Sequence, residues 1–501
     1  MKDKILFWID AEAVEFGVAK LLEQQDKFNL FAIYDFKHPL DLSFKNQKIV
    51  KFQKEWFFWD HVVNGNKKHD IDYLRKFEEE YGIDLWNLAY TERNFYQFNP
   101  FYTFKKNEIL RIFEQECKFF KYVLDEVKPN FLIIKVTDFH RNHLLKEMCK
   151  KKGIKVLSLT PTRIGNRATI TSEEDEFDEI WNTIIEKRTE LENFDVNEFL
   201  DTHSRLTQSK KVISGGVTLP TSKKIKVGLG WLLKPLDKNF KKSYEHNGVT
   251  KFKSMQLIFS SIIKSKVRKR FIDKNFLKRV EDKKIIFFPL QVEPERNVSL
   301  VAPYYSNQIN VILNIAKSLP IGYKLYVKEH FNMRLRYWRK ISDYKKIMEL
   351  PNVKLLHPSV NAQEILEKSS LVITIASTVG LEAAYHNKPA ITFVKMIYSS
   401  LSSVFHVKSF DELPKTIRMC LDKEMDYSDL GKFLKIIEKN SFECDVWGVY
   451  GLFSQEFHND GFLVSSEISM DELDSFLNKY KNHFELISNE FLKAIDKHKN
   501  L

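Results

Sequence analysis

The stretch that decides the fold runs from Tyr323 to Lys395. It contains three apolar segments, Lys324-Leu-Tyr-Val-Lys328, Leu371-Val-Ile-Thr-Ile375 and Lys388-Pro-Ala-Ile-Thr-Phe393. Between the last two lies Ala376-Ser-Thr-Val-Gly-Leu-Glu-Ala-Ala384, in which hydroxyl residues and a glycine precede a helical pattern. Strands that alternate with helices at this spacing predict a parallel sheet covered by helices.

The same alternation extends on both sides of this stretch. Further strands are predicted at 285–288 and 353–356, and the helical patterns between the strands cover 306–319, 340–348, 362–368 and 378–386. Residues 283–425 are therefore predicted to form one α/β domain.

The N-terminal part of the chain shows a second series. Strands are predicted at 4–9, 28–34, 131–136 and 154–159, with helices at 10–24, 109–127 and 139–152. The first strand, helix and strand form a βαβ unit, so this sheet is also expected to be parallel. Residues 1–200 are predicted to form the first domain, 201–282 a basic linker or insert, and 426–501 a helical tail.

Composition narrows the class of protein. The chain has 501 residues, of which 43% are hydrophobic, and this favours folded domains over disorder. It contains no apolar run long enough to span a membrane, and a cytoplasmic location, peripheral to the inner face of the membrane, is expected. The formal net charge of +12 predicts an anionic partner. Four separated cysteines are expected to be buried and reduced.

The helix start after the strand at 371–375 is the first candidate site. Ser377, Thr378 and Gly380 follow the carboxyl end of that strand, where ligands bind in open α/β sheets. A helix N-terminus attracts phosphate, and Glu382 one turn later could hold a ribose diol. Ordinary helix capping by Ser377 or Thr378, with Glu382 as partner, is an equally good interpretation.

Two other loops reach the same edge of the predicted sheet. Lys328 and His330 end one strand, and the histidine could bind phosphate or act as a general acid. Gln291 and Glu293 follow the strand at 285–288. Each of these residues is a candidate for donor binding, and a charged surface loop is the alternative in each case.

Polar residues also follow the strands of the first domain. Asp10, Asp138, Arg141 and Arg163 lie after three different strands and should converge on one rim. Asp10 or Asp138 could serve as a catalytic base, with Arg141 and Arg163 on the acceptor side. Asp138 could equally be the N-cap of the helix at 139–152.

Several motifs point to nothing further. Asp70-Ile-Asp72 precedes an amphipathic helix, so capping is expected rather than metal binding. His140 and His143 lack a third ligand nearby, and we predict no metal site. Phosphate-binding loops and hydrolase nucleophile motifs are absent from the sequence.

The basic segment around 255–280 has three interpretations. It could be a solvated linker face, a helix on an anionic membrane surface, or a nucleic-acid site. No nucleic-acid motif accompanies the charge, so nucleic acid is not expected as a partner.

Three motifs together resemble a known family. Ile285-Ile-Phe-Phe-Pro-Leu-Gln-Val-Glu-Pro-Glu-Arg296, Tyr326-Val-Lys-Glu-His330 and Ser377-Thr-Val-Gly-Leu-Glu-Ala383 resemble the bacterial capsule polysaccharide biosynthesis proteins. That group includes CMP-Kdo-dependent transferases and is similar to bacterial sialyltransferases. The resemblance covers about residues 283–395, is weak before 165, and is not seen at 166–282 or after 425.

The resemblance implies the GT-B fold, two Rossmann-like domains that face a cleft. It also implies that His330, Ser377 and Thr378 contact the donor phosphate, and that Gln291 and Glu382 match positions of the family motifs. The chain departs from the family at Phe331, where a proline is usual, and it lacks the Asp-Tyr-Ser-Ser signature of CDP-glycerol glycerophosphotransferases.

The expected function is transfer of a sugar from a nucleotide donor, a CMP-linked acidic sugar, to a glycan or lipid-linked acceptor, without a required metal or other cofactor. A nucleotide-sugar epimerase and a non-catalytic membrane-associated polysaccharide assembly or export factor are the alternatives.

Overall fold

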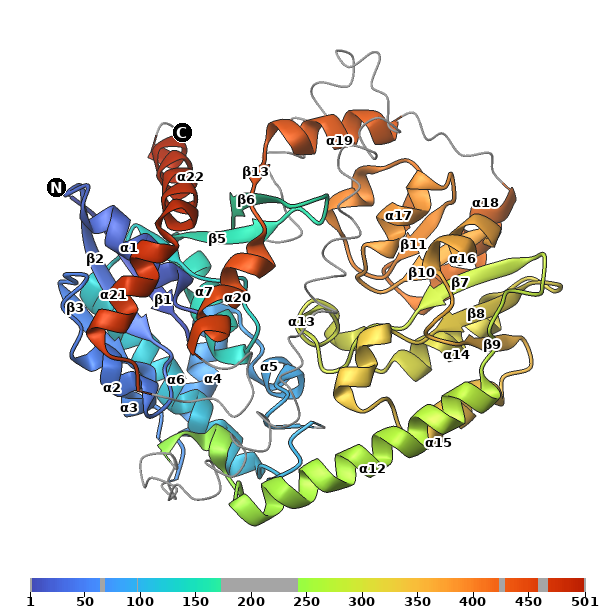
Figure 1. The fold of residues 1–501 in the computed structure, drawn as a ribbon, viewed down its shortest axis with the longest axis horizontal. Helices are drawn as coiled ribbons and strands as arrows, with labels where there is room; N and C mark the ends of the chain where they lie inside the picture. Colours follow the sequence, from blue (N-terminus) through green and yellow to red (C-terminus); the bar gives the residue numbers. More distant parts are fainter. Residues whose placement is uncertain are drawn as a thin grey trace. The chain divides into compact units, whose positions relative to one another are not determined.

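The computed structural model describes residues 2–63, 68–96, 98–172, 242–422, 429–457 and 467–499. The chain divides into two compact units (Figure 1). Unit 1 comprises Met1–Glu174, Arg205–Lys251 and Ser441–Leu501, and unit 2 comprises Asp175–Ser204 and Phe252–Asn440. Unit 2 is thus largely an insertion into the chain of unit 1.

Unit 1 contains a seven-stranded sheet in the order β13-β6-β5-β4-β1-β2-β3. The five strands from β5 to β3 are parallel, and β6 and β13 extend the edge in antiparallel pairing. The strands are β1 (Asp3–Ile9), β2 (Phe28–Tyr34), β3 (Lys54–Phe57), β4 (Phe131–Ile133), β5 (Lys155–Pro161), β6 (Arg167–Thr171) and β13 (Phe442–Glu443).

Helices cover both faces of this sheet, as the alternation of side chains in β1 requires. Ile5 and Phe7 belong to one hydrophobic core, and Leu6 and Trp8 to the other. The first core is covered by α1 (Val14–Glu23), α2 (Leu40–Lys45), α20 (Val446–Phe457), α21 (Met470–Lys479) and α22 (Lys481–Lys499). The second is covered by α3 (Phe58–His61), α4 (Ile71–Tyr81), α5 (Leu85–Thr91), α6 (Lys106–Val127) and α7 (His140–Lys151), with η3 (Tyr244–His246).

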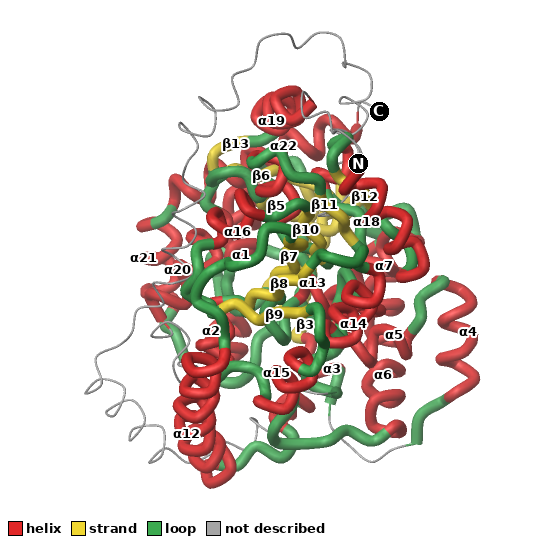
Figure 2. Tube along the Cα trace, turned by 90° about the vertical axis from the view of Figure 1, so that its right-hand side faces the viewer, coloured by secondary structure: helices red, strands yellow, loops and turns green. Residues whose placement is uncertain are grey.

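Unit 2 contains a six-stranded, wholly parallel sheet in the order β12-β11-β10-β7-β8-β9 (Figure 2, yellow). Its strands are β7 (Ile285–Pro289), β8 (Lys324–Lys328), β9 (Val353–Leu356), β10 (Leu371–Thr374), β11 (Ala390–Thr392) and β12 (Val404–His406). Its helices are α12 (Lys251–Asn275), α13 (Arg296–Ser299), α14 (Gln308–Ser318), α15 (Ile341–Met348), α16 (Ala362–Lys368), α17 (Val379–Tyr385), α18 (Leu413–Asp422) and α19 (Asp429–Lys439). Shorter 3-10 turns are η4 (Pro303–Tyr305), η5 (Phe331–Arg336), η6 (Ile397–Ser400) and η7 (Phe410–Glu412).

The two sheets share one topology. In each unit the chain adds its second and third strands on one side of the first strand, and its fourth and fifth strands on the other side. This is the Rossmann-type order, in which the loops after the first and fourth strands flank the topological switch point. The predicted pair of Rossmann-like domains is therefore confirmed.

Some elements differ from the sequence prediction. Residues 54–57 form β3, a strand that was not predicted, and they pair with β2 at the sheet edge. The predicted helical tail, residues 426–501, contains α20, α21 and α22, which pack on the unit 1 sheet, with α22 against α1. The predicted domain limits at 200, 282 and 425 stay predictions, and much of the basic segment 201–282 lies outside the described residues.

Candidate functional site

The unit 2 switch point lies between the loops after β7 and β10, and Gln291 joins them. In the orientation that satisfies its hydrogen bonds, the Gln291 side-chain oxygen accepts from the backbone N of Ala376 (2.8 Å) and of Ser377 (3.3 Å). The backbone N–H of Gln291 donates to Gln308 Oε1 at 2.8 Å, and Gln308 Nε2 donates back to the Gln291 carbonyl at 3.1 Å. Gln291 is buried and its side-chain oxygen joins the loops, and donor binding by this residue stays a prediction.

A buried ionic network joins the loop after β7 to the residues that follow β8. Glu329 is 0% exposed and accepts from Arg339 Nε (3.0 Å) and from Tyr344 OH (2.7 Å). Arg339 also pairs with Glu293 at 2.6 Å and donates to the Gln291 carbonyl. Glu293 is thus held in an ion pair, and the structure gives this predicted donor ligand a supporting role.

His330 follows Glu329 directly, after the end of β8. Its Nδ1 accepts from the backbone N–H of Asn332 at 3.1 Å, so in the neutral ring the proton lies on Nε2. Loss of hydration lowers the pKa of His330 to about 4, and the positive charges of Lys328 and Arg339 add to this effect. In the free protein His330 is therefore a neutral N–H donor at pH 7, and its predicted role as a phosphate ligand or general acid stays a prediction.

The start of α17 shows local bonds at each predicted hydroxyl. The N–H of Val379 donates to Ser377 Oγ at 3.3 Å, and Thr378 Oγ1 donates to Glu382 Oε1 at 3.2 Å. The helix has only seven residues, so its dipole is weak. These are the contacts of the capping interpretation, and binding of phosphate or ribose by Ser377, Thr378 and Glu382 stays a prediction.

Gly380 has a packing role that the sequence did not reveal. A Cβ atom there would lie 2.7 Å from the Tyr398 hydroxyl and 2.8 Å from its Cε2. The same hydroxyl donates to the Ser377 carbonyl. Tyr398 of η6 therefore gives a packing reason for the glycine, and its role as a donor ligand stays a prediction.

The unit 1 switch point lies between the loops after β1 and β4 and is acidic. Lys135 Nζ lies 2.7 Å from Glu12, 3.1 Å from Asp138 and 3.9 Å from Asp10. Asp10 also accepts from the backbone N–H of Glu12 at 2.9 Å. The predicted convergence of Asp10 and Asp138 is confirmed, and Lys135 is the residue that joins them.

Two glutamates at this switch point, Glu12 and Glu15, have raised pKa values. Loss of hydration and the charge of Asp10 raise the pKa of Glu12 to about 7, although Lys135 opposes the shift. Burial, with Asp10, raises the pKa of Glu15 to about 8. Glu15 accepts from Tyr450 OH of α20 at 2.9 Å, and Lys135 Nζ lies 5.1 Å from the centre of the Tyr450 ring.

The sequence places Glu12 and Glu15 on this rim after the first strand, although neither was proposed as a catalytic or binding residue. Lys135 and Tyr450 were not found, and Tyr450 carried no local signal. Asp138 is not the cap of α7: that position is Phe139, whose N–H donates to Asn142 Oδ1 at 3.1 Å.

Arg141 does not reach the predicted acceptor side. It is 3% exposed and pairs with Asp35 at 2.8 Å and with Glu245 at 2.7 Å. These pairs join the segment around η3 to α7 and to the loop after β2, so Arg141 is structural. Arg163 is half-buried, with a positive φ of 64° in the β5–β6 turn, and its acceptor-side role stays a prediction.

The motifs that resemble metal-binding patterns have structural roles. Asp70 caps α4 by accepting from the Tyr73 N–H at 3.0 Å. His140 is buried between Glu92 (2.6 Å) and Glu116 (2.9 Å), and these carboxylates raise its pKa to about 9 against the effect of burial. Across the described ranges, no group of three or more His, Cys, Asp or Glu side chains could hold a metal ion. The four cysteines are buried and free, as predicted.

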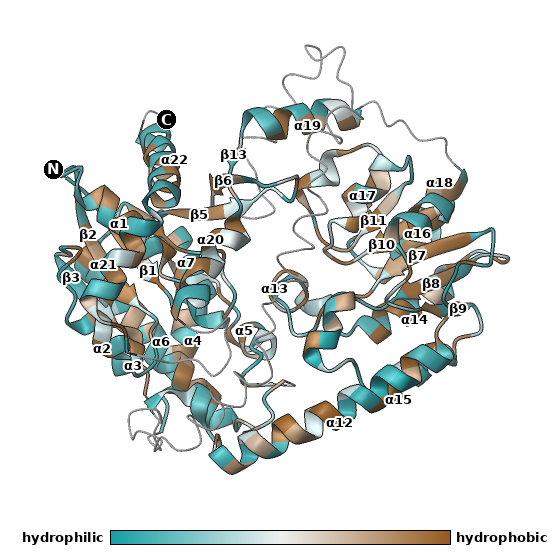
Figure 3. Cartoon of the chain, viewed as in Figure 1, coloured by the Kyte–Doolittle hydropathy of each residue, from teal (hydrophilic) through white to brown (hydrophobic). Residues whose placement is uncertain are grey.

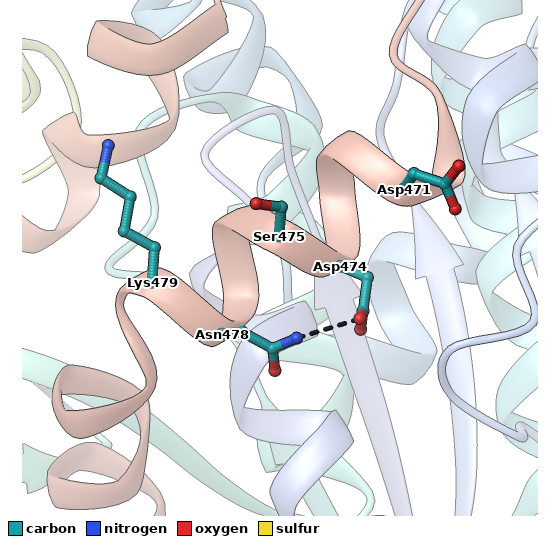
Figure 4. Close-up of a pocket in the computed structure, with 5 residues that line it drawn as sticks. All are labelled: Asp471, Asp474, Ser475, Asn478 and Lys479. Atoms are coloured by element: carbon teal, nitrogen blue, oxygen red, sulfur yellow. Dashed lines mark hydrogen bonds between the residues drawn. The ribbon is translucent and has the colours of Figure 1, made fainter.

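A surface pocket lies along α21 in unit 1 (Figure 4). Asn478 Nδ2 donates to Asp474 Oδ2 at 3.0 Å, and Asp474 also pairs with Lys20 at 2.8 Å. All the lining residues come from this one helix, and none belongs to either switch point: Asp471, Asp474, Ser475, Asn478 and Lys479. We therefore do not regard this pocket as the functional site.

Comparison with known proteins bears on unit 2. Residues 235–403 match a family model described as "Capsule polysaccharide biosynthesis protein". The predicted resemblance is confirmed. The matched segment contains β7, β8, β10 and β11 with the loops that follow them. No curated protein matches the chain.

Solved structures give weaker likenesses. They include UDP-GlcNAc 2-epimerase from Methanocaldococcus jannaschii (12% identity, 88% of this chain, 100% of that chain, TM-score 0.25). UDP-GlcNAc 2-epimerase from Neisseria meningitidis bound to UDP-GlcNAc is another (13% identity, 87% of this chain, 100% of that chain, TM-score 0.23). The N-terminal domain of Candida albicans trehalose-6-phosphate phosphatase is a third (12% identity, 93% of this chain, 98% of that chain, TM-score 0.30). These TM-scores are too low to carry an argument about this chain.

Proposed function

We propose that the protein is a glycosyltransferase that moves a sugar, a CMP-linked acidic sugar, from its nucleotide to a surface polysaccharide or glycan, and that unit 2 binds the nucleotide. The observation that supports this most is the family match, because its residues 235–403 include the loops at the switch point of the unit 2 sheet. Ligands of open α/β sheets bind at that place.

The charge at this edge supports an anionic donor. Lys328 and Arg339 contribute, after loss of hydration, to lowering the pKa of His330, so positive charge lies near this histidine, although Arg339 is paired with Glu293 and Glu329. A phosphate placed at the same position would be attracted by that charge. In this proposal His330 Nε2–H and the hydroxyls of Ser377 and Thr378 donate to the phosphate and stabilise the charge that develops as the nucleotide leaves.

The proton released by the acceptor hydroxyl needs a base. We propose the unit 1 acidic cluster for this role, with Glu12 added to the predicted Asp10 and Asp138. A pKa of about 7 suits a general base at neutral pH, because the free carboxylate is populated and is still basic.

Thermal-shift assays with CMP, CDP, UDP and GDP test nucleotide binding at the donor site directly. We expect CMP to raise the melting temperature of the natural protein and not that of His330→Ala/Ser377→Ala, while both melt at the same temperature without nucleotide. The control variant Ser342→Ala/His483→Ala changes the same residue types at exposed positions and should respond like the natural protein.

Activity then separates the alternatives. Transfer from CMP-linked sugar to a capsule oligosaccharide supports the proposal, whereas release of an epimerised sugar without any acceptor supports an epimerase. If no nucleotide raises the melting temperature, the donor site is overturned and a non-catalytic assembly factor is favoured.

A further inference from the structure

Helix α12 of unit 2 carries a large exposed apolar surface. Phe252, Phe259 and Ile263 are 77%, 62% and 64% exposed and lie at positions i, i+7 and i+11, on one face of the helix. Soluble proteins rarely leave such a row of large apolar side chains in water unless the surface has a partner. Further exposed members flank the row: Ile258, Ile262 and Val267.

The same face becomes basic toward the C-terminal end of the helix. Lys266 and Arg270 continue the row at i+14 and i+18, with Lys264 and Lys269 beside them. From Lys251 to Ile272 the sequence has seven basic residues and no acidic one. Figure 3 shows apolar and polar residues mixed along α12 rather than a helix of uniform character.

Among the described residues, the opposite face of α12 makes most of the contacts with unit 2, and Asp273 adds a contact with His357 at 3.1 Å. Arg268 Nη1 donates to the carbonyls of Tyr337 (3.1 Å) and Trp338 (2.7 Å), and Phe271 stacks on Tyr344. Ile272 is buried. These contacts fix the C-terminal half of the helix and leave its outer face exposed.

The Arg268 contacts also place η5 beside the helix. This turn begins directly after His330 and exposes Leu335 and Arg336. Because Arg268 lies on the attached face of α12, we count only the exposed row and its basic neighbours as what we call the α12 surface.

We propose that the α12 surface binds a lipid bilayer that contains anionic phospholipid, with the helix lying in the plane of the interface. The positive charges complement the phospholipid phosphates, and the apolar side chains enter the region of the acyl chains. A helix of 25 residues is about 37 Å long, so many headgroups can be contacted at once. Within the described residues, no helix is long and apolar enough to cross a bilayer.

Other occupants fit the α12 surface less well. Nucleic acid would satisfy the basic residues but would leave the exposed phenylalanine and isoleucine side chains in water. A second copy in a symmetric dimer would bring the same basic surface against itself, and the like charges would repel. The proposal does not depend on sugar transfer, since it rests on α12 alone.

Vesicle co-sedimentation of the full chain tests the proposal. We expect binding to vesicles of phosphatidylethanolamine with phosphatidylglycerol, weakened by salt, and little binding to phosphatidylcholine vesicles. Phe259→Ser/Ile263→Ser and Lys266→Glu/Arg270→Glu should each weaken binding roughly tenfold or more. Ile321→Ser removes a fully exposed isoleucine of the same unit, outside the α12 surface, and should have no effect.

Several results would overturn the proposal. They are absence of binding by the natural protein, equal binding to both kinds of vesicle, or unchanged binding by the two α12 variants. Self-association that the Phe259→Ser/Ile263→Ser variant abolishes, without vesicle binding, would identify a second copy as the occupant. Binding of single-stranded DNA without vesicle binding would identify nucleic acid. Melting temperatures with and without CMP, measured on the same samples, show that the variants fold and keep the outcome for the donor site separate.

Discussion

The two units share one strand order, but different kinds of residues occupy their switch points. At the unit 2 switch point, neutral Gln291 joins the loops, and the rim offers His330 near two cations. At the unit 1 switch point, Lys135 joins the loops and the rim is formed by carboxylates. Topology thus decides where a site can form, whereas the residues that close the switch point decide its charge. An anion suits the first rim, and a group that gives up a proton suits the second.

The largest expected effect concerns the cations that hold each switch point together. Arg339→Ala should reduce the free energy of unfolding by about 3–5 kcal/mol, because it leaves Glu329 buried without its charge partner. Lys135→Ala should cost less, about 1–2 kcal/mol, because Asp138 and Glu12 are partly exposed and can be hydrated. Urea denaturation of both variants measures the difference, and equal losses would contradict the contrast between the two networks.

The next effect tests the packing of the unit 2 loop. Gly380→Ala should destabilise the protein by about 1–3 kcal/mol, because the new methyl group overlaps Tyr398. The loss should be much smaller in a Tyr398→Ala background, which a double-mutant cycle in urea would show. Gly451→Ala, in helix α20, meets only the flexible Gln455 side chain and serves as control. Equal losses in both backgrounds would remove Tyr398 as the reason for the glycine.

A smaller effect concerns protons in the unit 1 cluster. The pKa of Glu15 is raised from 4.5 to about 8, so the folded state keeps a proton that the unfolded state has lost. This contribution to stability is complete below about pH 4.5 and is lost as the pH rises toward 8. The free energy of unfolding should therefore decrease less between pH 5 and 8 in Glu15→Gln than in the natural protein, by about 1–2 kcal/mol. Glu79→Gln, at an exposed position of α4, should leave the fall unchanged.

The smallest effect concerns the unit 2 rim. Because the pKa of His330 is lowered to about 4, the free ring is neutral at pH 6, and a bound phosphate should raise its pKa again. CMP binding should then take up part of a proton and strengthen as the pH falls, by less than about tenfold per pH unit. Calorimetry in two buffers of different ionisation enthalpy, compared with His330→Asn, measures this uptake. Identical uptake by both proteins would place His330 away from the phosphate.

Periodicity was sufficient to predict where both sites would lie. The strands of each sheet are short apolar segments, and polar residues directly after them must reach the carboxyl edge. Asp10, Asp138, Gln291 and Ser377 were found in this way. Their positions follow from the strand order alone and do not depend on side-chain packing.

Contacts between distant residues were not predictable from a single sequence. Tyr450 contacts Glu15 across 435 residues, and Arg141 contacts Glu245 across 104. No local pattern marks such pairs, so Arg141 looked like a free rim residue and Tyr450 like an ordinary helix residue. Likewise, Gly380 resembled a site glycine because nothing near it in sequence indicates Tyr398.

The division of unit 1 has a consequence for how the protein is made. Its core contains Phe16 and Val18 from the start of the chain together with Phe484 and Phe491 from the end, whereas unit 2 is complete by residue 440. On the ribosome, unit 2 can therefore finish folding while unit 1 still waits for α20, α21 and α22. During that interval the α1 face of unit 1 is uncovered, and a nascent chain stalled in that interval should need a chaperone until its last helices emerge.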